Sequence, residues 1–299
     1  MKPRNIRTAK LPWLMAGVST LATLCAAADN TQPAPAPPQD PAAVLKPIRA
    51  TKIILVGDST VAVQGGWGSS FCAEHVTSFA ACVNLARGGR SSGSYFAEGS
   101  WELALAEART PGFEATWILI QFGHNDQPGK PGRSTDLATE FPANLKRYIN
   151  EARAAGARPI LVTPLTRRMF TEGKLENSLR PWAETTIRIA AEMNVPLLDL
   201  NQRSHDAIQQ MGGTAANEMA QRPPSAEVAA ASKAGNSIPA STGVTATESN
   251  ERPAIEGMAQ PKVAFDYTHL GRRGADYFAS MVVEELALKV PELRPLLIP

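Results

Sequence analysis

The sequence predicts an α/β fold in which helices cover both faces of a parallel sheet. Five apolar runs of strand length recur along the 299 residues, at 52–56, 83–85, 116–122, 159–163 and 196–200, and segments with helical spacing lie between them. Alternation of this kind is typical of a parallel sheet, because each crossover between parallel strands is right-handed and commonly contains a helix. The hydrophobic fraction of 43% is sufficient for a sizeable core.

The first 28 residues predict a secretory signal peptide. Four cations (Lys2, Arg4, Arg7 and Lys10) precede an apolar stretch at 11–24, and Ala26-Ala27-Ala28 offers a small-residue cleavage site. The alternative is an uncleaved N-terminal anchor. Cleavage would remove four positive charges and move the formal net charge from +2 to −2. The basic balance therefore gives no argument for nucleic acid binding, and we expect a periplasmic or secreted protein without stable membrane insertion.

After the signal, residues 29–50 form a Pro- and Ala-rich segment that is typical of an extended linker. The clearest helix is predicted over 136–155. Its apolar side chains recur on one face: Leu137, Phe141, Leu145, Tyr148, Ile149 and Ala152. Further helices are predicted over 179–193, 201–211 and 272–289. The domain itself is expected over 51–299.

Residues 212–262 interrupt the alternation. This stretch is rich in small and polar residues and contains no aromatic residue, so it offers little apolar area to offset the entropy of ordering it. It predicts a disordered, low-complexity insertion. The alternative is a mobile lid, because the insertion ends just before a candidate catalytic segment.

Two cysteines, Cys72 and Cys82, remain once the signal peptide is removed. In an oxidising compartment they can pair, and the alternative is two separate buried thiols. A zinc site is disfavoured, since no histidine pair lies close to them in sequence.

Gly57-Asp58-Ser59-Thr60 follows the first apolar run directly. This pattern predicts a strand that ends in a tight turn, with the Ser59 hydroxyl at the carboxyl edge of the sheet, where open α/β sheets bind ligands. Ser59 is a candidate nucleophile if a base and an oxyanion site can reach it.

The base is sought among four histidines: His75, His124, His205 and His269. A neutral imidazole is the usual acceptor of a hydroxyl proton near neutral pH. His269 is the best candidate, because Asp266 lies three residues upstream and can fix its tautomer if the loop turns there. Taken alone, Asp-x-x-His is equally typical of an ordinary loop before a helix.

Two further turns supply candidate oxyanion donors. Gly88-Gly89 allows close approach of the backbone, and Asn125 follows the strand run 116–122. Both are also ordinary turn sequences. A competing nucleophile is Ser91, because Gly89-Arg90-Ser91-Ser92-Gly93 matches the Gly-x-Ser-x-Gly elbow. Its preceding strand is short and the following residues are poor helix formers, which disfavours Ser91.

The order of these blocks is more specific than any one of them. Gly57-Asp58-Ser59, Gly89, Gly123-His124-Asn125-Asp126 and Asp266-x-x-His269 together resemble the four sequence blocks of the SGNH (GDSL-type) hydrolase family. The resemblance spans residues 51–289 apart from the insertion. Within the family it is strongest to the rhamnogalacturonan acetylesterase branch, because of Thr60, Arg90-Ser91, His124 and Thr268, and Gly274-Ala275 after the last block.

The resemblance implies a three-layer α/β/α sandwich with a flavodoxin-like parallel sheet. It implies Ser59 as nucleophile, His269 as general base and Asp266 as the group that orients it. The N–H groups of Ser59 and Gly89 and the Asn125 amide would form the oxyanion hole. The expected activity is removal of acetyl groups from plant cell-wall polysaccharide, with pectic rhamnogalacturonan as substrate, without cofactor or metal. The chain departs from the family pattern in its insertion.

Several alternatives stay open at this point. The nearest are an acetylxylan esterase and a lipase- or thioesterase-type member of the same family; a non-catalytic carbohydrate-binding module and a metal-dependent hydrolase are more distant. Arg90 is a candidate substrate contact, since it adjoins an oxyanion glycine and pectic uronates are anionic. Arg167, Trp67, Trp101 and Trp182 are weaker candidates, and for the tryptophans packing is the simpler interpretation. Oligomeric state is not predicted.

Overall fold

Five parallel strands form the central sheet of the computed structural model, which describes residues 50–239 and 264–299. The strands are β1 (Ala50–Gly57), β2 (Ala80–Asn84), β3 (Phe113–Gln121), β4 (Arg158–Val162) and β7 (Leu197–Leu198). Their order in the sheet is β2-β1-β3-β4-β7, and every pairing is parallel. This is the flavodoxin-like doubly wound order. The predicted signal peptide, the linker up to residue 49 and residues 240–262 of the insertion lie outside the described residues.

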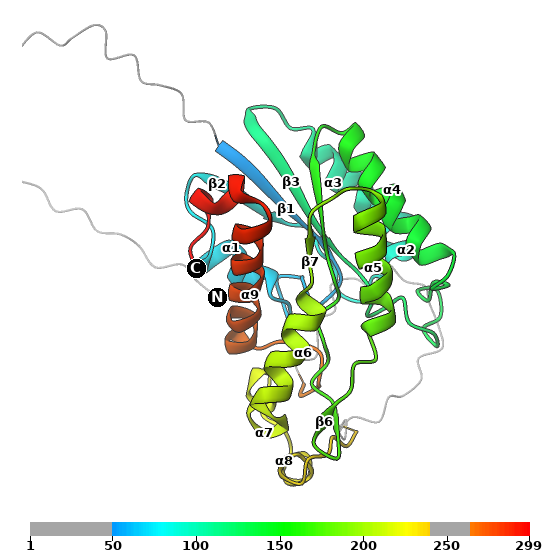
Figure 1. Cartoon of the computed structure of the whole chain (residues 1–299), viewed down its shortest axis with the longest axis vertical. Coiled ribbons are helices and arrows are strands. Elements are labelled where there is room, and N and C mark those ends of the chain that lie inside the picture. The colour runs from blue at the N-terminus through cyan, green and yellow to red at the C-terminus, as the bar shows by residue number, and fades with distance from the viewer. Residues whose placement is uncertain (1–49, 240–263) are drawn as a thin grey trace, which may run out of the picture. The chain divides into compact units, whose positions relative to one another are not determined.

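Helices cover both faces of this sheet (Figure 1). Alternate residues of β1 point to opposite faces, so Ile53 and Leu55 pack in one core and Ile54 and Val56 in the other. The first core includes α1 (Gly68–Glu74), α6 (Leu200–Met211), α9 (Arg272–Lys289) and the 3₁₀ helix η2 (Pro291–Leu296). The second includes α2 (Ser92–Ala97), α3 (Ser100–Ala108), α4 (Glu140–Ala154) and α5 (Arg180–Glu192). The predicted three-layer α/β/α sandwich is confirmed.

The bridge between Cys72 and Cys82 is formed. It joins α1 to β2 across 10 residues of sequence, and by the chain-entropy estimate a loop of that size contributes about 2–3 kcal/mol to stability. Of the two alternatives left open by the sequence, the structure therefore has the disulfide.

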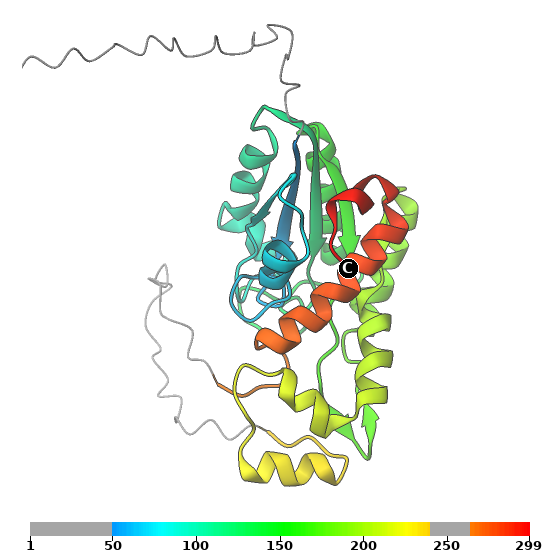
Figure 2. The same ribbon diagram turned by 90° about the vertical axis from the view of Figure 1, so that its left-hand side faces the viewer.

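The prediction of disorder over 212–262 is wrong for residues 212–239. This part contains α7 (Gly213–Ala216), the 3₁₀ helix η1 (Asn217–Met219) and α8 (Ala226–Lys233). These helices gather near the end of α6, beside a hairpin of β5 (Phe170–Thr171) and β6 (Lys174–Leu175) (Figures 1 and 2). Few apolar residues suffice, because Ala216, Met219 and Val228 are all buried. These aliphatic side chains form the buried contacts of a segment that contains no aromatic residue.

Hydrogen bonds tie this helical segment to the rest of the domain. Ser237 N donates to Phe170 O at 2.8 Å, and Gly271 N donates to Met219 O at 2.8 Å. The Tyr267 hydroxyl donates to Ile238 O at 2.7 Å. The chain on either side of residues 240–263 is thus held at one place, next to the predicted catalytic segment 266–269.

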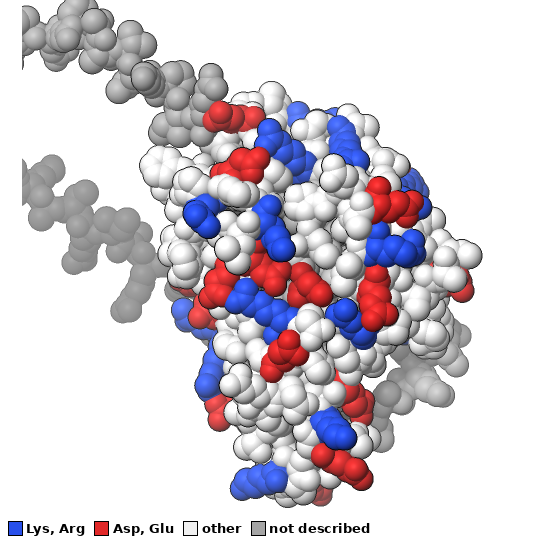
Figure 3. All heavy atoms as spheres, viewed as in Figure 1, with Lys and Arg blue, Asp and Glu red and all other residues white. Residues whose placement is uncertain are grey.

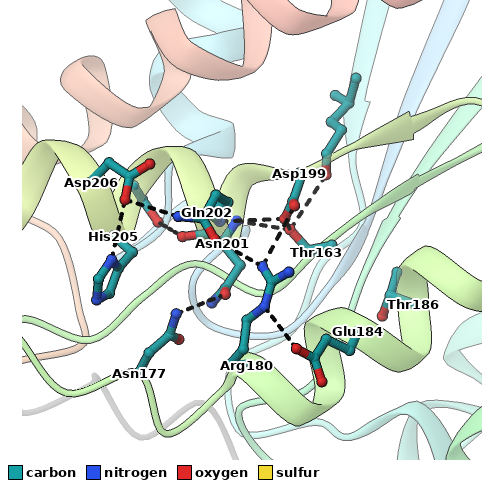
Figure 4. Close-up of polar contacts among 12 residues, drawn as sticks. Thr163, Asn177, Arg180, Glu184, Thr186, Asp199, Asn201, Gln202, His205 and Asp206 are labelled. Atoms are coloured by element: carbon teal, nitrogen blue, oxygen red, sulfur yellow. Dashed lines mark hydrogen bonds and ion pairs between the residues drawn. The ribbon is translucent and has the colours of Figure 1, made fainter.

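The segment that follows β4 is held from one side by the start of α6 (Figure 4). The Thr163 hydroxyl donates to Asp199 Oδ1 at 2.9 Å and accepts from Asn201 N at 2.8 Å. Arg180 pairs with Asp199 at 3.6 Å. One turn further along α6, Ser204 Oγ accepts from Thr166 N at 3.1 Å. These contacts fix the backbone just before Arg167 and Arg168.

Acidic and basic side chains are interspersed on the face shown in Figure 3. No helix of the described residues combines the length and the hydrophobicity needed to cross a bilayer.

Candidate active site

Ser59 and His269 meet at the carboxyl edge of the sheet, although 210 residues separate them in sequence. His269 Nε2 lies 2.9 Å from Ser59 Oγ, and His269 Nδ1 lies 2.7 Å from Asp266 Oδ2. A carboxylate beside Nδ1 favours the tautomer in which Nδ1–H donates to Asp266 and Nε2 accepts from Ser59. The arrangement has the geometry of a nucleophile, a base and the group that orients the base.

The turn that presents Ser59 is fixed by a buried polar chain. Asp58 Oδ1 accepts from the backbone N–H and the hydroxyl of Thr60, both at 2.8 Å. Gln121 Nε2, at the end of β3, donates to the Thr60 hydroxyl at 2.7 Å and Gln121 Oε1 accepts from Trp67 Nε1 at 3.0 Å. Gly57 is required here, because a Cβ would lie 2.6 Å from Gln121 O. The Gly-Asp-Ser-Thr sequence therefore sets the local backbone as well as providing the hydroxyl.

The Asp-x-x-His loop folds around its own carboxylate. Asp266 Oδ1 accepts from Thr268 N at 2.7 Å and from His269 N at 2.6 Å, which leaves Oδ2 for the imidazole. Burial alone would raise the pKa of Asp266, but hydrogen bonds and the charge of His269 lower it to about 2. The hydrogen bond to Asp266 raises the pKa of His269 above its ordinary value, against an opposing effect of burial.

Arg168 supports this loop from beneath and was not identified from the sequence. Its side chain is 1% exposed. Nη2 donates to the carbonyl oxygens of Asp266 and His269, both at 2.9 Å, and Nη1 donates to Thr268 O at 3.2 Å. Its backbone N–H also donates to Tyr267 O at 2.9 Å. Burial lowers the pKa of this guanidinium to about 10, so it is charged at neutral pH.

The three predicted oxyanion groups lie together. A Cβ added to Gly88 would lie 3.7 Å from Ser59 Cβ, so the Gly88-Gly89 turn lies against Ser59. Gly89 adopts φ +78°, a left-handed conformation that favours glycine. Asn125 Nδ2 donates to Arg90 O at 3.1 Å, which leaves its second N–H available. Among the described residues, the backbone N–H groups of Ser59 and Gly89 have no hydrogen-bond partner. These N–H groups can therefore donate hydrogen bonds to a negatively charged oxygen.

The loop after β3 is anchored below Asn125. Asp126 accepts from Ser92 N, from the Ser92 hydroxyl at 2.6 Å and from the Thr135 hydroxyl at 2.9 Å; burial raises its pKa to about 6. Lys130 Nζ donates to His124 O at 2.6 Å and lies 3.4 Å from Asn125 Oδ1. Asp126 and Lys130 thus fix the loop that carries the Asn125 amide.

The other three histidines do not face Ser59. His124 is buried with Nδ1 3.4 Å from Asp58 Oδ2, and burial lowers its pKa, so it is neutral. His75 contacts Ile298 O and Asp276, and His205 contacts Asp206. His269 is therefore the histidine that the described structure offers to Ser59.

The competing candidates have structural roles. Ser91 is fully buried as the N-cap of α2, where its Oγ accepts from Ser94 N at 3.1 Å, so it is not available as a nucleophile. Trp67, Trp101 and Trp182 are buried, as expected for packing residues. Arg90 is engaged by Glu98 Oε2 at 2.8 Å and by Gly88 O at 2.8 Å; its predicted contact with substrate stays a prediction. Across residues 50–239 and 264–299, no group of three or more His, Cys, Asp or Glu gathers as a metal site.

Comparison with known proteins identifies the family. The model of the GDSL-like lipase/acylhydrolase family matches residues 55–223. The chain is 38% identical over 162 residues to the probable rhamnogalacturonan acetylesterase YesY of Bacillus subtilis (strain 168), covering 52% of this chain and 72% of that one. It is also 38% identical over 163 residues to the rhamnogalacturonan acetylesterase RhgT of the same organism, covering 52% and 66%.

Solved structures share the fold. Protein YXIM of Bacillus subtilis superposes with a TM-score of 0.57 at 23% identity, covering 81% of this chain and 58% of that one. A catalytic mutant of Axe2, an acetylxylan esterase from Geobacillus stearothermophilus, superposes with a TM-score of 0.50 at 15% identity, covering 81% and 96%. The resemblance found in the sequence is confirmed by the family model: this chain belongs to the GDSL-like lipase/acylhydrolase family and is an ester hydrolase.

Proposed function

We propose that this chain is a periplasmic or secreted carbohydrate esterase that removes acetyl groups from pectic rhamnogalacturonan by a Ser-His-Asp mechanism. The observation that carries the mechanism is the continuous contact from Ser59 Oγ through His269 to Asp266. The names of the two curated relatives support the substrate. The predicted signal peptide supports the location.

In the first half of the reaction, Ser59 Oγ attacks the carbonyl carbon of the acetyl ester. His269 Nε2 takes the hydroxyl proton as the bond forms. The carbonyl oxygen becomes negatively charged and accepts hydrogen bonds from the backbone N–H groups of Ser59 and Gly89 and from the side-chain amide of Asn125. When the intermediate collapses, the bond to the sugar oxygen breaks and His269 returns the proton to that oxygen. The products are the free sugar hydroxyl and an acetyl group on Ser59.

In the second half, water attacks the acetyl-enzyme. His269 accepts a proton from the water, the same N–H groups stabilise the second tetrahedral intermediate, and the proton passes to Ser59 Oγ as acetate leaves. Asp266 keeps the imidazole in the required tautomer and stabilises its protonated form.

Activity should fall as the pH is lowered, with a midpoint above the ordinary histidine value of about 6.5. The reason is that only neutral His269 can accept the Ser59 proton, while the hydrogen bond to Asp266 raises the pKa of His269. The measurement is kcat/KM for an aryl acetate against pH. Asp266→Asn should move the midpoint to lower pH and reduce the plateau. A flat profile from about pH 5 to 8 would contradict a histidine base.

Asn125→Ala should lower kcat by about 10²–10³, because one oxyanion donor is lost and the others remain. KM for the same ester should change much less, since the donor acts mainly on charge that develops in the transition state. Steady-state kinetics on an aryl acetate measures both constants. A loss confined to KM would remove Asn125 from the oxyanion hole.

The substrate is tested by acetate release from acetylated rhamnogalacturonan and acetylated xylan, together with aryl esters of short and long acids. We expect release from the pectic polymer and a preference for acetate over long-chain esters. Preferential release from xylan would favour an acetylxylan esterase, a candidate supported by the fold shared with Axe2. Preference for long acyl chains would instead indicate a lipase- or thioesterase-type enzyme.

A further inference from the structure

Three cations around the candidate active site have no carboxylate partner among the described residues. Lys130 and Arg133 lie in the loop after β3, and Arg167 lies in the segment after β4. Their side-chain partners are neutral oxygens: His124 O and Asn125 Oδ1 for Lys130, Gly89 O for Arg133 and the Ser178 hydroxyl for Arg167. Arg90 differs, because Glu98 neutralises it. We refer to Lys130, Arg133 and Arg167 as the cationic rim.

Two members of the cationic rim contact residues of the predicted oxyanion hole directly. Arg133 Nη1 lies 3.4 Å from Gly89 O, and Lys130 Nζ lies 3.4 Å from Asn125 Oδ1. Since Gly88-Gly89 lies against Ser59, an anion held by these cations would be bound next to the ester under attack. Lys130 and Arg133 therefore lie directly beside the predicted oxyanion hole.

The members of the rim also act on one another. Burial lowers the pKa of Lys130, and the positive charges of Arg167 and Arg133 lower it further. Burial likewise lowers the pKa of Arg167. The carboxylates of Asp58 and Asp126 attract these cations from beneath, but both are buried and hold Thr60, Ser92 and Thr135 by hydrogen bonds. Partly desolvated like charges without a direct carboxylate partner favour the binding of an anion from outside.

We propose that Lys130, Arg133 and Arg167 form a subsite for a substrate carboxylate, a uronate close to the acetylated sugar. Guanidinium groups suit this role, because their planar N–H donors match the two oxygens of a carboxylate. The inference rests on the proposed acetylesterase function and adds what the site selects: an acidic glycan backbone in preference to a neutral one. Of the three, Arg167 was a candidate substrate contact from the sequence, whereas Lys130 and Arg133 were not.

The test compares one polymer in two charge states. Acetylated rhamnogalacturonan oligosaccharides are assayed beside the same preparation with its uronates reduced to neutral sugars and its acetylation matched. We expect wild-type kcat/KM to be higher on the acidic form. In Arg133→Gln/Arg167→Gln the acidic-to-neutral ratio should fall about tenfold, the amount expected for losing a hydrogen bond to a charged group. Lys130 is left unchanged, because it also holds Asn125.

A matched control is Arg109→Gln/Arg294→Gln. Arg109 follows α3 just before β3, and Arg294 lies in η2 beyond the end of α9; both are exposed. This variant removes two positive charges, as the rim variant does, without touching the rim, so its acidic-to-neutral ratio should equal that of the wild type. An equal fall in the control and in the rim variant would show a general charge effect and would overturn the subsite.

Failure of the subsite and failure of the proposed function give different results. If acetate is released from the acidic and the reduced polymer in a ratio that the rim substitutions leave unchanged, the subsite is wrong and the acetylesterase stands. If no polymer is hydrolysed, the proposed function fails, and the subsite is tested by inhibition of aryl acetate hydrolysis. Unacetylated galacturonate oligosaccharides should then inhibit the wild type at least about tenfold better than the double variant. Equal inhibition of both enzymes would overturn it.

Discussion

Ser59→Ala should lower kcat for ester hydrolysis by a factor on the order of 10⁴–10⁶. The loss is this large because the covalent route disappears, and the oxyanion donors alone retain only a small part of the rate enhancement. Aryl acetate hydrolysis measures the loss, and a fluorophosphonate probe should label the wild type but not the variant. The fold should be unaffected, since the Ser59 hydroxyl contacts His269 and is not a member of the polar chain through Thr60.

Ser91→Ala is the matched control, because it removes the competing serine hydroxyl. Ser91 caps α2, so its loss should lower the free energy of unfolding by about 1 kcal/mol, the usual effect of an N-cap. Ester hydrolysis should continue at a rate close to that of the wild type. Activity in Ser59→Ala combined with inactivity in Ser91→Ala would reverse the assignment of the nucleophile.

Arg168→Met should cost both stability and catalysis. The substitution leaves the carbonyl oxygens of Asp266, Thr268 and His269 without their buried donor, and unpaired buried polar groups cost about 1–3 kcal/mol each. The loop that carries Asp266 and His269 then loses these hydrogen bonds. We expect kcat/KM to fall by about 10² or more, because a small misplacement of a catalytic group has an effect of that size. Chemical denaturation and steady-state kinetics measure the two losses.

A pH profile separates positioning from stability in this variant. The positive charge of Arg168 lowers the pKa of His269, so its removal should move the acidic limb of kcat/KM to higher pH. Arg168→Lys keeps the charge but not the forked donors, and should retain the position of the limb with intermediate activity. Arg203→Met, which removes a partner of Met281 O and Glu284, should lower stability without moving the limb. Wild-type activity in Arg168→Met would contradict the role.

The sequence was informative where local pattern and tertiary structure agree. β1 and β3 are buried on both faces, so their apolar runs were visible without knowledge of the fold. Ser59, Asn125 and His269 follow strands or precede a helix, and parallel strands bring such positions to one edge. Their meeting in the structure was therefore predictable from their order in the chain.

Other features depend on partners distant in sequence and gave no local signal. Arginine usually lies at the surface, so nothing in the sequence indicated that Arg168 would be buried. Its burial is explained by the carbonyl oxygens of the 266–269 loop, which accept hydrogen bonds from its guanidinium. α1, α2 and α3 are short and rich in serine, alanine and glycine, so their helical period is weak. The helices at 213–233 bury Ala216, Met219 and Val228, and the two-stranded hairpin close to them was not predicted either. In each case tertiary packing overrides a weak propensity.

The hydrogen bond from the Tyr267 hydroxyl to Ile238 O holds together the two described segments that flank residues 240–263. Closing a longer loop between fixed ends costs little additional entropy, about 0.6 kcal/mol for each doubling of its length. We therefore expect a change in the number of residues between Ile238 and Tyr267 to alter the free energy of unfolding little, although it is made close to His269. An evolving or engineered enzyme can therefore accept a new inserted segment between Ile238 and Tyr267 without changes to its candidate catalytic residues.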